Sequence, residues 1–129
     1  MNKFVLTTGS ILGILGIIIG AFAAHGLEKL IDTEAQQTFE TGVRYQMYHA
    51  LFLLAVGMMP KITHKAKKQI GILVVLGILF FSGSIYGLAT NNLSAFDFKI
   101  IGFITPIGGL LLILAWLFFL IKILKMKQD

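Results

Sequence analysis

The length of the apolar runs constrains the fold more than any other feature of this sequence. The first run, from Phe4 to Ala24, contains no charged residue. Crossing a hydrocarbon core of about 30 Å takes roughly 20 helical residues. Three further runs lie at residues 44–59, 70–89 and 100–121. The sequence therefore predicts an all-α membrane protein with four transmembrane helices in a bundle, as a single domain over residues 1–129.

Composition agrees with this prediction. The chain is 57% hydrophobic and has a mean hydropathy of +0.87, and only 13% of its residues are charged, whereas soluble domains average about a quarter. The net charge is +5, but the basic residues occupy short connections and the C-terminal end. That pattern favours membrane topology, and we expect no nucleic-acid partner.

A signal peptide is the alternative interpretation of the first run. Lys3 would be its charged start and Ala21–Ala23 its cleavage site. The run is longer than the usual apolar region of roughly 7–15 residues in signal peptides. We therefore favour a membrane span.

The second helix is expected to begin before its apolar part. Thr33 and Gln36 have the spacing of a capping box, which predicts a helix from about Glu34 to Met59, stopped by Pro60. Its first turns are amphipathic. They predict an interfacial extension that leads into the second membrane helix.

Basic residues predict the orientation. They concentrate in the segments that lie on the same side as the two termini, and the positive-inside rule then places both termini in the cytoplasm of a multi-pass protein of the cell (inner) membrane. Lipid headgroups are the expected partners of five basic side chains: Arg44, Lys61, Lys65, Lys67 and Lys68.

Glycines at four-residue spacing predict close helix packing, because small residues let backbones approach each other in lipid. They serve either packing within the chain or a homo-oligomer. The positions are Gly9, Gly13, Gly16, Gly20, Gly83 and Gly87.

Polar residues within the apolar runs fall mostly in the outer half of the predicted bundle. Pro106 is expected to interrupt the fourth helix and to leave the carbonyl near Gly102 without its usual partner. That break either only shapes the bundle or belongs to a functional cluster. The candidate cluster is His25, Tyr45, Gln46, His49, Tyr86, Thr105 and Pro106.

Whether His25 and His49 meet is left open by the sequence. Facing histidines in a bundle can ligate a haem or relay protons, or they can hydrogen-bond neighbouring groups as structural links. No third ligand has metal spacing and there is no cysteine. We predict no metal site and no cofactor.

Four segments resemble one known family: residues 20–27 (GAFAAHGL), 39–51 (FETGVRYQMYHAL), 82–86 (SGSIY) and 104–109 (ITPIGG). They are similar to the YgdD/YwdK-like family of small membrane proteins, domain of unknown function 423, with eukaryotic relatives called transmembrane protein 256. Ala23 stands where the family pattern has glycine. The resemblance implies a four-helix inner-membrane protein and supplies no activity.

Three function classes remain. The leading one is a non-enzymatic protein that packs with itself or a larger membrane partner and supports membrane integrity. The second is transport of a small solute or protons through the cluster around His25 and His49, and the third is a haem- or quinone-binding redox protein. No nucleophile–base pair, phosphate loop or carboxylate dyad points to an ordinary hydrolase or phosphoryl transferase.

Overall fold

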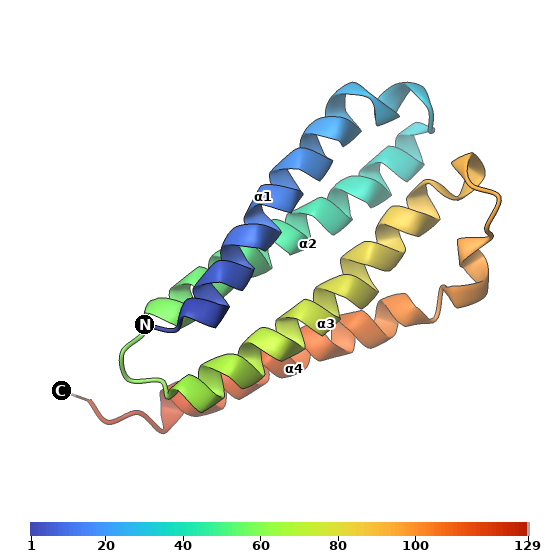
Figure 1. The fold of residues 1–129 in the computed structure, drawn as a ribbon. Helices are drawn as coiled ribbons and strands as arrows, with labels where there is room; N and C mark the ends of the chain where they lie inside the picture. The colour runs from blue at the N-terminus through green and yellow to red at the C-terminus, as the bar shows by residue number, and fades with distance from the viewer. Residues whose placement is uncertain (129) are drawn as a thin grey trace.

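The computed structural model describes residues 1–128, and over these it contains helices and no strand. Figure 1 shows two helical hairpins side by side, with Met1 and the end of α4 at the same end of the molecule. Short 3₁₀ turns occupy the connections at the other end: η1 (Leu27–Lys29), η2 (Asn91–Leu93) and η3 (Phe98–Ile101). The four long helices are α1 (Lys3–His25), α2 (Thr33–Met58), α3 (His64–Ala89) and α4 (Ile104–Leu124).

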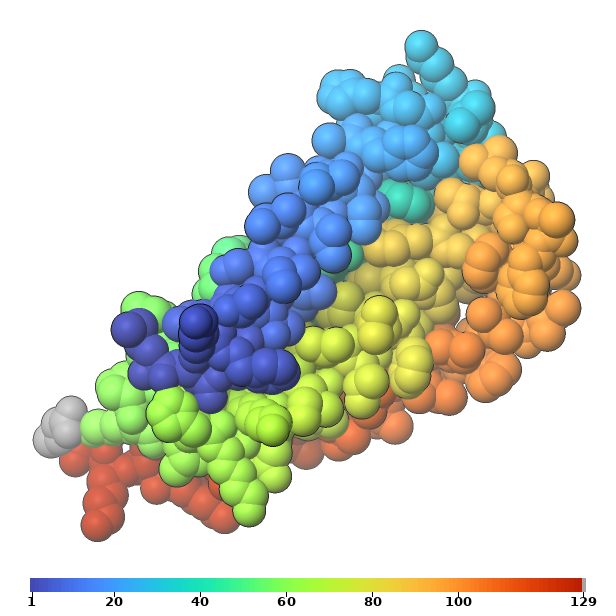
Figure 2. Space-filling model, in the orientation of Figure 1, coloured from blue at the N-terminus to red at the C-terminus, as the bar shows by residue number. Residues whose placement is uncertain are grey.

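The helices pack mainly as neighbours in chain order. α1 lies along α2, α3 lies along α4, and α2 contacts α3. In the space-filling view α1 and α4 form the two outer edges, with α3 between them (Figure 2). α2 is therefore the helix that joins the two hairpins.

Three of the helices are long and apolar enough to cross a membrane: α1 with its following turn, α3 and α4. α2 has the same length as α3, 26 residues, but its first half carries Glu34, Glu40 and Arg44. Large apolar side chains cover the outer faces, and Ile17, for example, is 66% exposed. Such faces suit a lipid environment rather than water.

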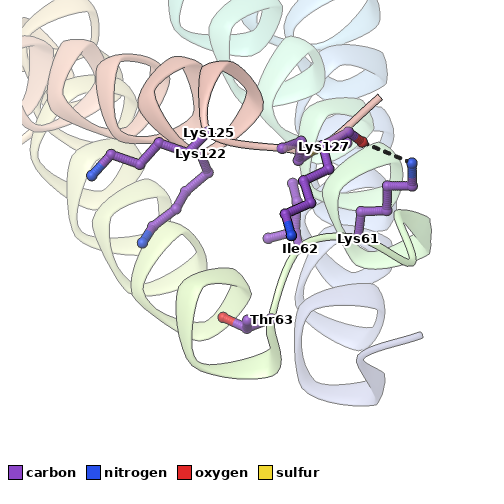
Figure 3. A pocket seen from close by; sticks show the side chains of 7 residues that line it. Lys61, Ile62, Thr63, Lys122, Lys125 and Lys127 are labelled. Carbon is purple, nitrogen blue, oxygen red and sulfur yellow. Dashed lines mark hydrogen bonds between the residues drawn. The ribbon is translucent and has the colours of Figure 1, made fainter. Parts of the chain in front are cut away.

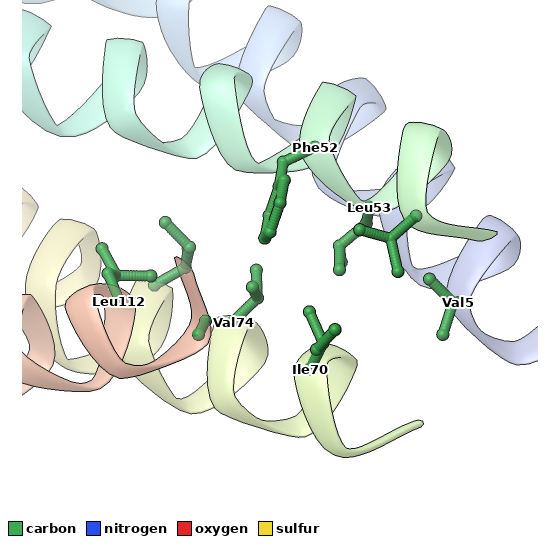
Figure 4. Packing of buried hydrophobic residues seen from close by; sticks show 9 residues of the cluster. Val5, Phe52, Leu53, Ile70, Val74 and Leu112 are labelled. Atoms are coloured by element: carbon green, nitrogen blue, oxygen red, sulfur yellow. The ribbon is translucent and has the colours of Figure 1, made fainter. Parts of the chain in front are cut away.

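All four helices contribute to one apolar core. Figure 4 shows Phe52 and Leu53 of α2 directed towards Ile70 and Val74 of α3. A smaller cluster lies at the opposite end, around Leu27 and Phe39. The main core consists of Val5, Phe52, Leu53, Val56, Ile70, Val74, Ile78, Leu112 and Ala115.

The glycines of α1 bring its backbone close to α2. A Cβ on Gly9 would lie 2.9 Å from the Ala50 carbonyl oxygen, and one on Gly16 would lie 2.5 Å from the Met47 sulfur. Gly13 and Gly20 also face α2, towards Ala50 and Val43. This face is occupied within the chain, so a homo-oligomer would have to use another one.

Contrary to the sequence prediction, Gly83 and Gly87 of α3 do not pack closely against another long helix. Gly83 is exposed and has no side chain near it, and Gly87 lies against Phe98 of η3 rather than against another long helix. The close approach of α3 and α4 instead occurs at Gly108, where a Cβ would collide with the backbone nitrogen of Phe81 and lie 2.8 Å from the Gly77 carbonyl oxygen.

Two helix starts also differ from the sequence prediction. Asp32, not Thr33, caps α2, because its carboxylate accepts the Ala35 N–H at 2.8 Å. Gln36 is therefore not part of a capping box. α3 begins at His64 rather than near Ile70, since Thr63 caps it by accepting the Ala66 N–H at 3.1 Å.

The predicted interruption of the fourth helix is wrong. α4 begins at Ile104, so Pro106 lies in its first turn, where a backbone N–H would have no intrahelical partner and proline is tolerated. The Gly102 carbonyl is not orphaned, because it accepts the Thr105 N–H at 3.4 Å. The irregular backbone lies before the helix, in η3.

Candidate functional site

Gln46 links three helices. It is 3% exposed on the buried face of α2. Its Nε2 donates to the Leu12 carbonyl of α1 at 2.9 Å. Its Oε1 accepts the Tyr86 hydroxyl of α3 at 2.6 Å. Both ends of the amide are thus engaged with other helices.

Glycine at position 42 makes the Tyr86 contact possible. A Cβ there would lie 2.8 Å from the Tyr86 ring, so a larger residue would push the tyrosine out of reach of Gln46. The Gly42 carbonyl also accepts the hydroxyl of Ser82 at 2.7 Å. This part of α2 is therefore shaped to receive α3.

His49 links α2 to α4. Its Nδ1 lies 2.7 Å from the Tyr45 carbonyl oxygen, and the indole N–H of Trp116 donates to its Nε2 at 3.0 Å. A carbonyl only accepts and an indole N–H only donates, so the neutral Nδ1–H tautomer satisfies both contacts. The Trp116 ring also stacks on Phe52, with centroids 4.0 Å apart.

Hydroxyl and amide groups supply two further links between helices. The hydroxyl oxygens of Ser84 in α3 and Thr105 in α4 lie 2.5 Å apart. Gln36 donates to the Ala23 carbonyl of α1 at 2.7 Å. Each neighbouring pair of helices therefore shares at least one side-chain hydrogen bond.

The two histidines do not meet. Gln36 of α2 contacts Ala23, two residues before His25, and so marks the level of His25 on α2. His49 lies 13 residues after Gln36 on the same helix, which corresponds to about 20 Å. His25 is exposed at the end of α1. One haem or metal ion cannot be held by both. Among residues 1–128 there is also no group of three or more histidine and carboxylate side chains suited to a metal ion.

A hollow lies beside His49 on the surface formed by α2, α3 and α4. Its volume is about 460 Å³. Mostly apolar side chains line it, and the polar exceptions include the Tyr45 phenol. The lining residues are Tyr45, His49, Phe81, Gly109, Leu112, Ile113 and Trp116.

The five basic residues that were expected at lipid headgroups have different environments in the structure. Lys61, Lys65 and Lys68 are exposed. Lys67 differs, since it is 1% exposed and its Nζ donates to the Gly57 carbonyl near the end of α2 at 3.0 Å. An ammonium there stabilises the negative end of the helix dipole. Arg44 donates to the Thr41 hydroxyl at 3.0 Å.

The sequence analysis did not include Trp116 among its candidate residues. An indole N–H in an apolar helix needs an acceptor, and that requirement was the available signal. Ser82 and Ser84 appeared there only within the family segment 82–86, without their partners.

Replacing Trp116 by phenylalanine is expected to keep most of the stacking on Phe52 and to remove the donor to His49. Interhelical hydrogen bonds in membranes average about 0.6 kcal/mol and reach roughly 1.7. We expect a loss of stability in that range, measured by chemical unfolding in detergent and followed by circular dichroism. An unchanged unfolding midpoint would contradict the link between α2 and α4.

These features define a small, multi-pass, helical membrane protein in which buried polar side chains link neighbouring helices. The chain belongs to the family described as "Protein of unknown function (DUF423)", whose match covers residues 19–109. It is 40% identical over 123 residues to a UPF0382 membrane protein of Staphylococcus saprophyticus, covering 95% of this chain and 98% of the relative.

Relatives in other bacteria match over similar lengths. Identity is 37% to the UPF0382 membrane protein YwdK of Bacillus subtilis, over 95% of this chain and 98% of YwdK. It is 31% to the UPF0382 inner membrane protein YgdD of Escherichia coli, over 99% of this chain and 95% of YgdD. No solved structure gives a significant match. The resemblance inferred from the sequence motifs is confirmed.

Proposed function

We propose that this protein is a non-enzymatic structural component of the inner membrane, which packs with itself or with larger membrane proteins and so supports membrane integrity. The observation that carries the proposal is the pairing of the buried polar side chains. Gln46, His49 and Ser82 bond to partners on neighbouring helices. These hydrogen bonds connect the helices, which supports a structural role for the three side chains.

In this proposal α2 is the fourth membrane-crossing helix. Its 26 residues give about 39 Å, which exceeds a hydrocarbon core of about 30 Å. Its position between α1 and α3 supports the assignment, because Gln46 and His49 in its middle are buried among the helices. The lysine-rich end, with both termini, would face the cytoplasm.

Transport is the second candidate, and the hollow beside His49 and Tyr45 is the observation that favours it. A histidine in an apolar setting is a recurring element of proton pathways. In this chain, however, both ring nitrogens of His49 already have partners. A relay through it would first have to break the bond to Trp116.

Proton flux in proteoliposomes separates the two candidates. The protein is reconstituted with a pH-sensitive dye inside the vesicles, and His49→Ala is compared with His25→Ala, the same substitution at an exposed helix end. The structural role predicts no flux above protein-free vesicles and a lower melting temperature for His49→Ala only. A pH-driven flux that His49→Ala abolishes while the fold survives would establish transport instead.

Chemical cross-linking in native membranes tests the packing role itself. A tagged copy of the protein is expected to yield a defined adduct with a second copy or with a larger membrane protein. Recovery of the monomer alone, at cross-linker levels that trap known complexes in the same membranes, would contradict the proposal.

A further inference from the structure

A basic hollow lies at the terminal end of the molecule. It has a volume of about 480 Å³ and is formed where the α2–α3 connection meets the end of α4. Figure 3 shows Lys122 and Lys125 extending to one side of it and Lys127 lying on the other. The lining residues are Lys61, Ile62, Thr63, Lys122, Lys125, Met126 and Lys127.

Contacts within the chain hold this hollow in shape. The Lys61 ammonium donates to the Lys127 carbonyl at 3.0 Å, which fastens the segment after α4 to the α2–α3 connection (Figure 3). Ile62 is 5% exposed and anchors that connection. The Thr63 oxygen accepts the Ala66 N–H, which leaves its hydroxyl proton able to bond a further acceptor.

Among residues 1–128, the charged side chains that line the hollow are all basic. The carboxylates among residues 1–128 lie in the connections at the opposite end and in the first turns of α2: Glu28, Asp32, Glu34, Glu40 and Asp97. Ammonium groups gathered around one space repel each other, and an anion between them would turn that repulsion into attraction.

An apolar hollow of about 510 Å³ lies along the preceding turns of α4. Leu120 and Ile123 line it, and Lys122 and Lys125, near the same end of α4, line the basic hollow. An apolar hollow and a basic hollow therefore both lie near the end of α4. A ligand that fits both carries a negative charge at one end and a hydrocarbon chain at the other.

We propose that this surface is a binding site for an anionic phospholipid, with its phosphate among Lys122, Lys127 and Thr63 and an acyl chain along the apolar hollow of α4. Basic pockets at helix ends are a known way of holding such headgroups. The apolar hollow near the same end of α4 favours a lipid over a free phosphate ion. The site is independent of the structural role proposed above.

Native mass spectrometry of the delipidated protein tests the proposal. The probes are phosphatidylglycerol and phosphatidylcholine with identical acyl chains, added to the protein in neutral detergent. We expect phosphatidylglycerol to bind more tightly, and the double variant Lys122→Gln/Lys127→Gln to lower its apparent affinity about tenfold or more, given the usual contribution of each basic residue.

The matched control is Lys65→Gln/Lys68→Gln. It removes the same charge from the same end of the molecule, outside the hollow, where the two lysines meet headgroups only from the surrounding lipid. It should therefore lower the affinity much less than the variant in the hollow. Three results would each overturn the proposal: equal losses in the two double variants, equal binding of the two lipids, or displacement of phosphatidylglycerol by inorganic phosphate. Circular dichroism of both variants checks that the helices are retained.

Discussion

Replacing Gly108 by alanine is expected to destabilise the protein, whereas the same change at Gly83 is expected to be neutral or stabilising. The added Cβ at Gly108 would collide with the Phe81 nitrogen and crowd the Gly77 carbonyl oxygen. These are backbone atoms, so relief requires α3 and α4 to move apart. Overpacking of this kind typically costs about 1–3 kcal/mol.

Gly83 provides the matched control because it lies within α3 and faces open space. Alanine there gains roughly 0.5–1 kcal/mol of helix propensity over glycine. Thermal unfolding in detergent, followed by circular dichroism, should move the two midpoints in opposite directions. Equal shifts would show that the close approach of α3 and α4 at Gly108 is not present.

Replacing Gln46 by leucine is the second large expected effect. Leucine has a similar size but cannot bond the Leu12 carbonyl or the Tyr86 hydroxyl, and the phenol loses its partner between the helices. Leaving a buried polar group without a partner costs about 1–3 kcal/mol. We expect a loss of that size and weaker contact of α2 with both α1 and α3.

Gln37→Leu is the control, since Gln37 is exposed on the same helix. Its unfolding midpoint should remain close to that of the unchanged protein. The double variant Gln46→Leu/Tyr86→Phe should recover part of the loss, because it removes both partners of one hydrogen bond. No recovery would mean that Tyr86 and Gln46 do not act as a pair.

The sequence predicted the helices well because long apolar runs leave few alternatives. The glycine spacing of α1 also indicated a close-packing face, since small residues serve mainly that purpose in membranes, but it left open whether the partner is another helix of the chain or a second copy. Errors arose where two local signals competed. Asp32 and Thr33 are both good helix caps. Asp32 is the cap because its backbone is extended, whereas Thr33 is already the first helical residue.

Partners across the bundle could not be predicted from local pattern. The pairing of His49 with Trp116 depends on how α2 and α4 rotate about their axes, as does that of Ser84 with Thr105. The burial of Lys67 likewise follows from α3 starting six residues earlier than expected, which brings its ammonium to the end of α2. Side chains that belong to one motif in the sequence, such as His25 and His49, can thus lie far apart.

Single-cysteine labelling tests most directly the claim that all four helices cross the membrane. The chain has no cysteine, so exposed residues can be replaced one at a time: Lys29 and Asn92 at one end, Lys65 and Gln128 at the other. A membrane-impermeant maleimide is expected to label Lys29→Cys and Asn92→Cys in spheroplasts, and Lys65→Cys and Gln128→Cys only after permeabilisation. Labelling of Lys29→Cys and Lys65→Cys from the same side would show that α2 does not cross and would contradict this account.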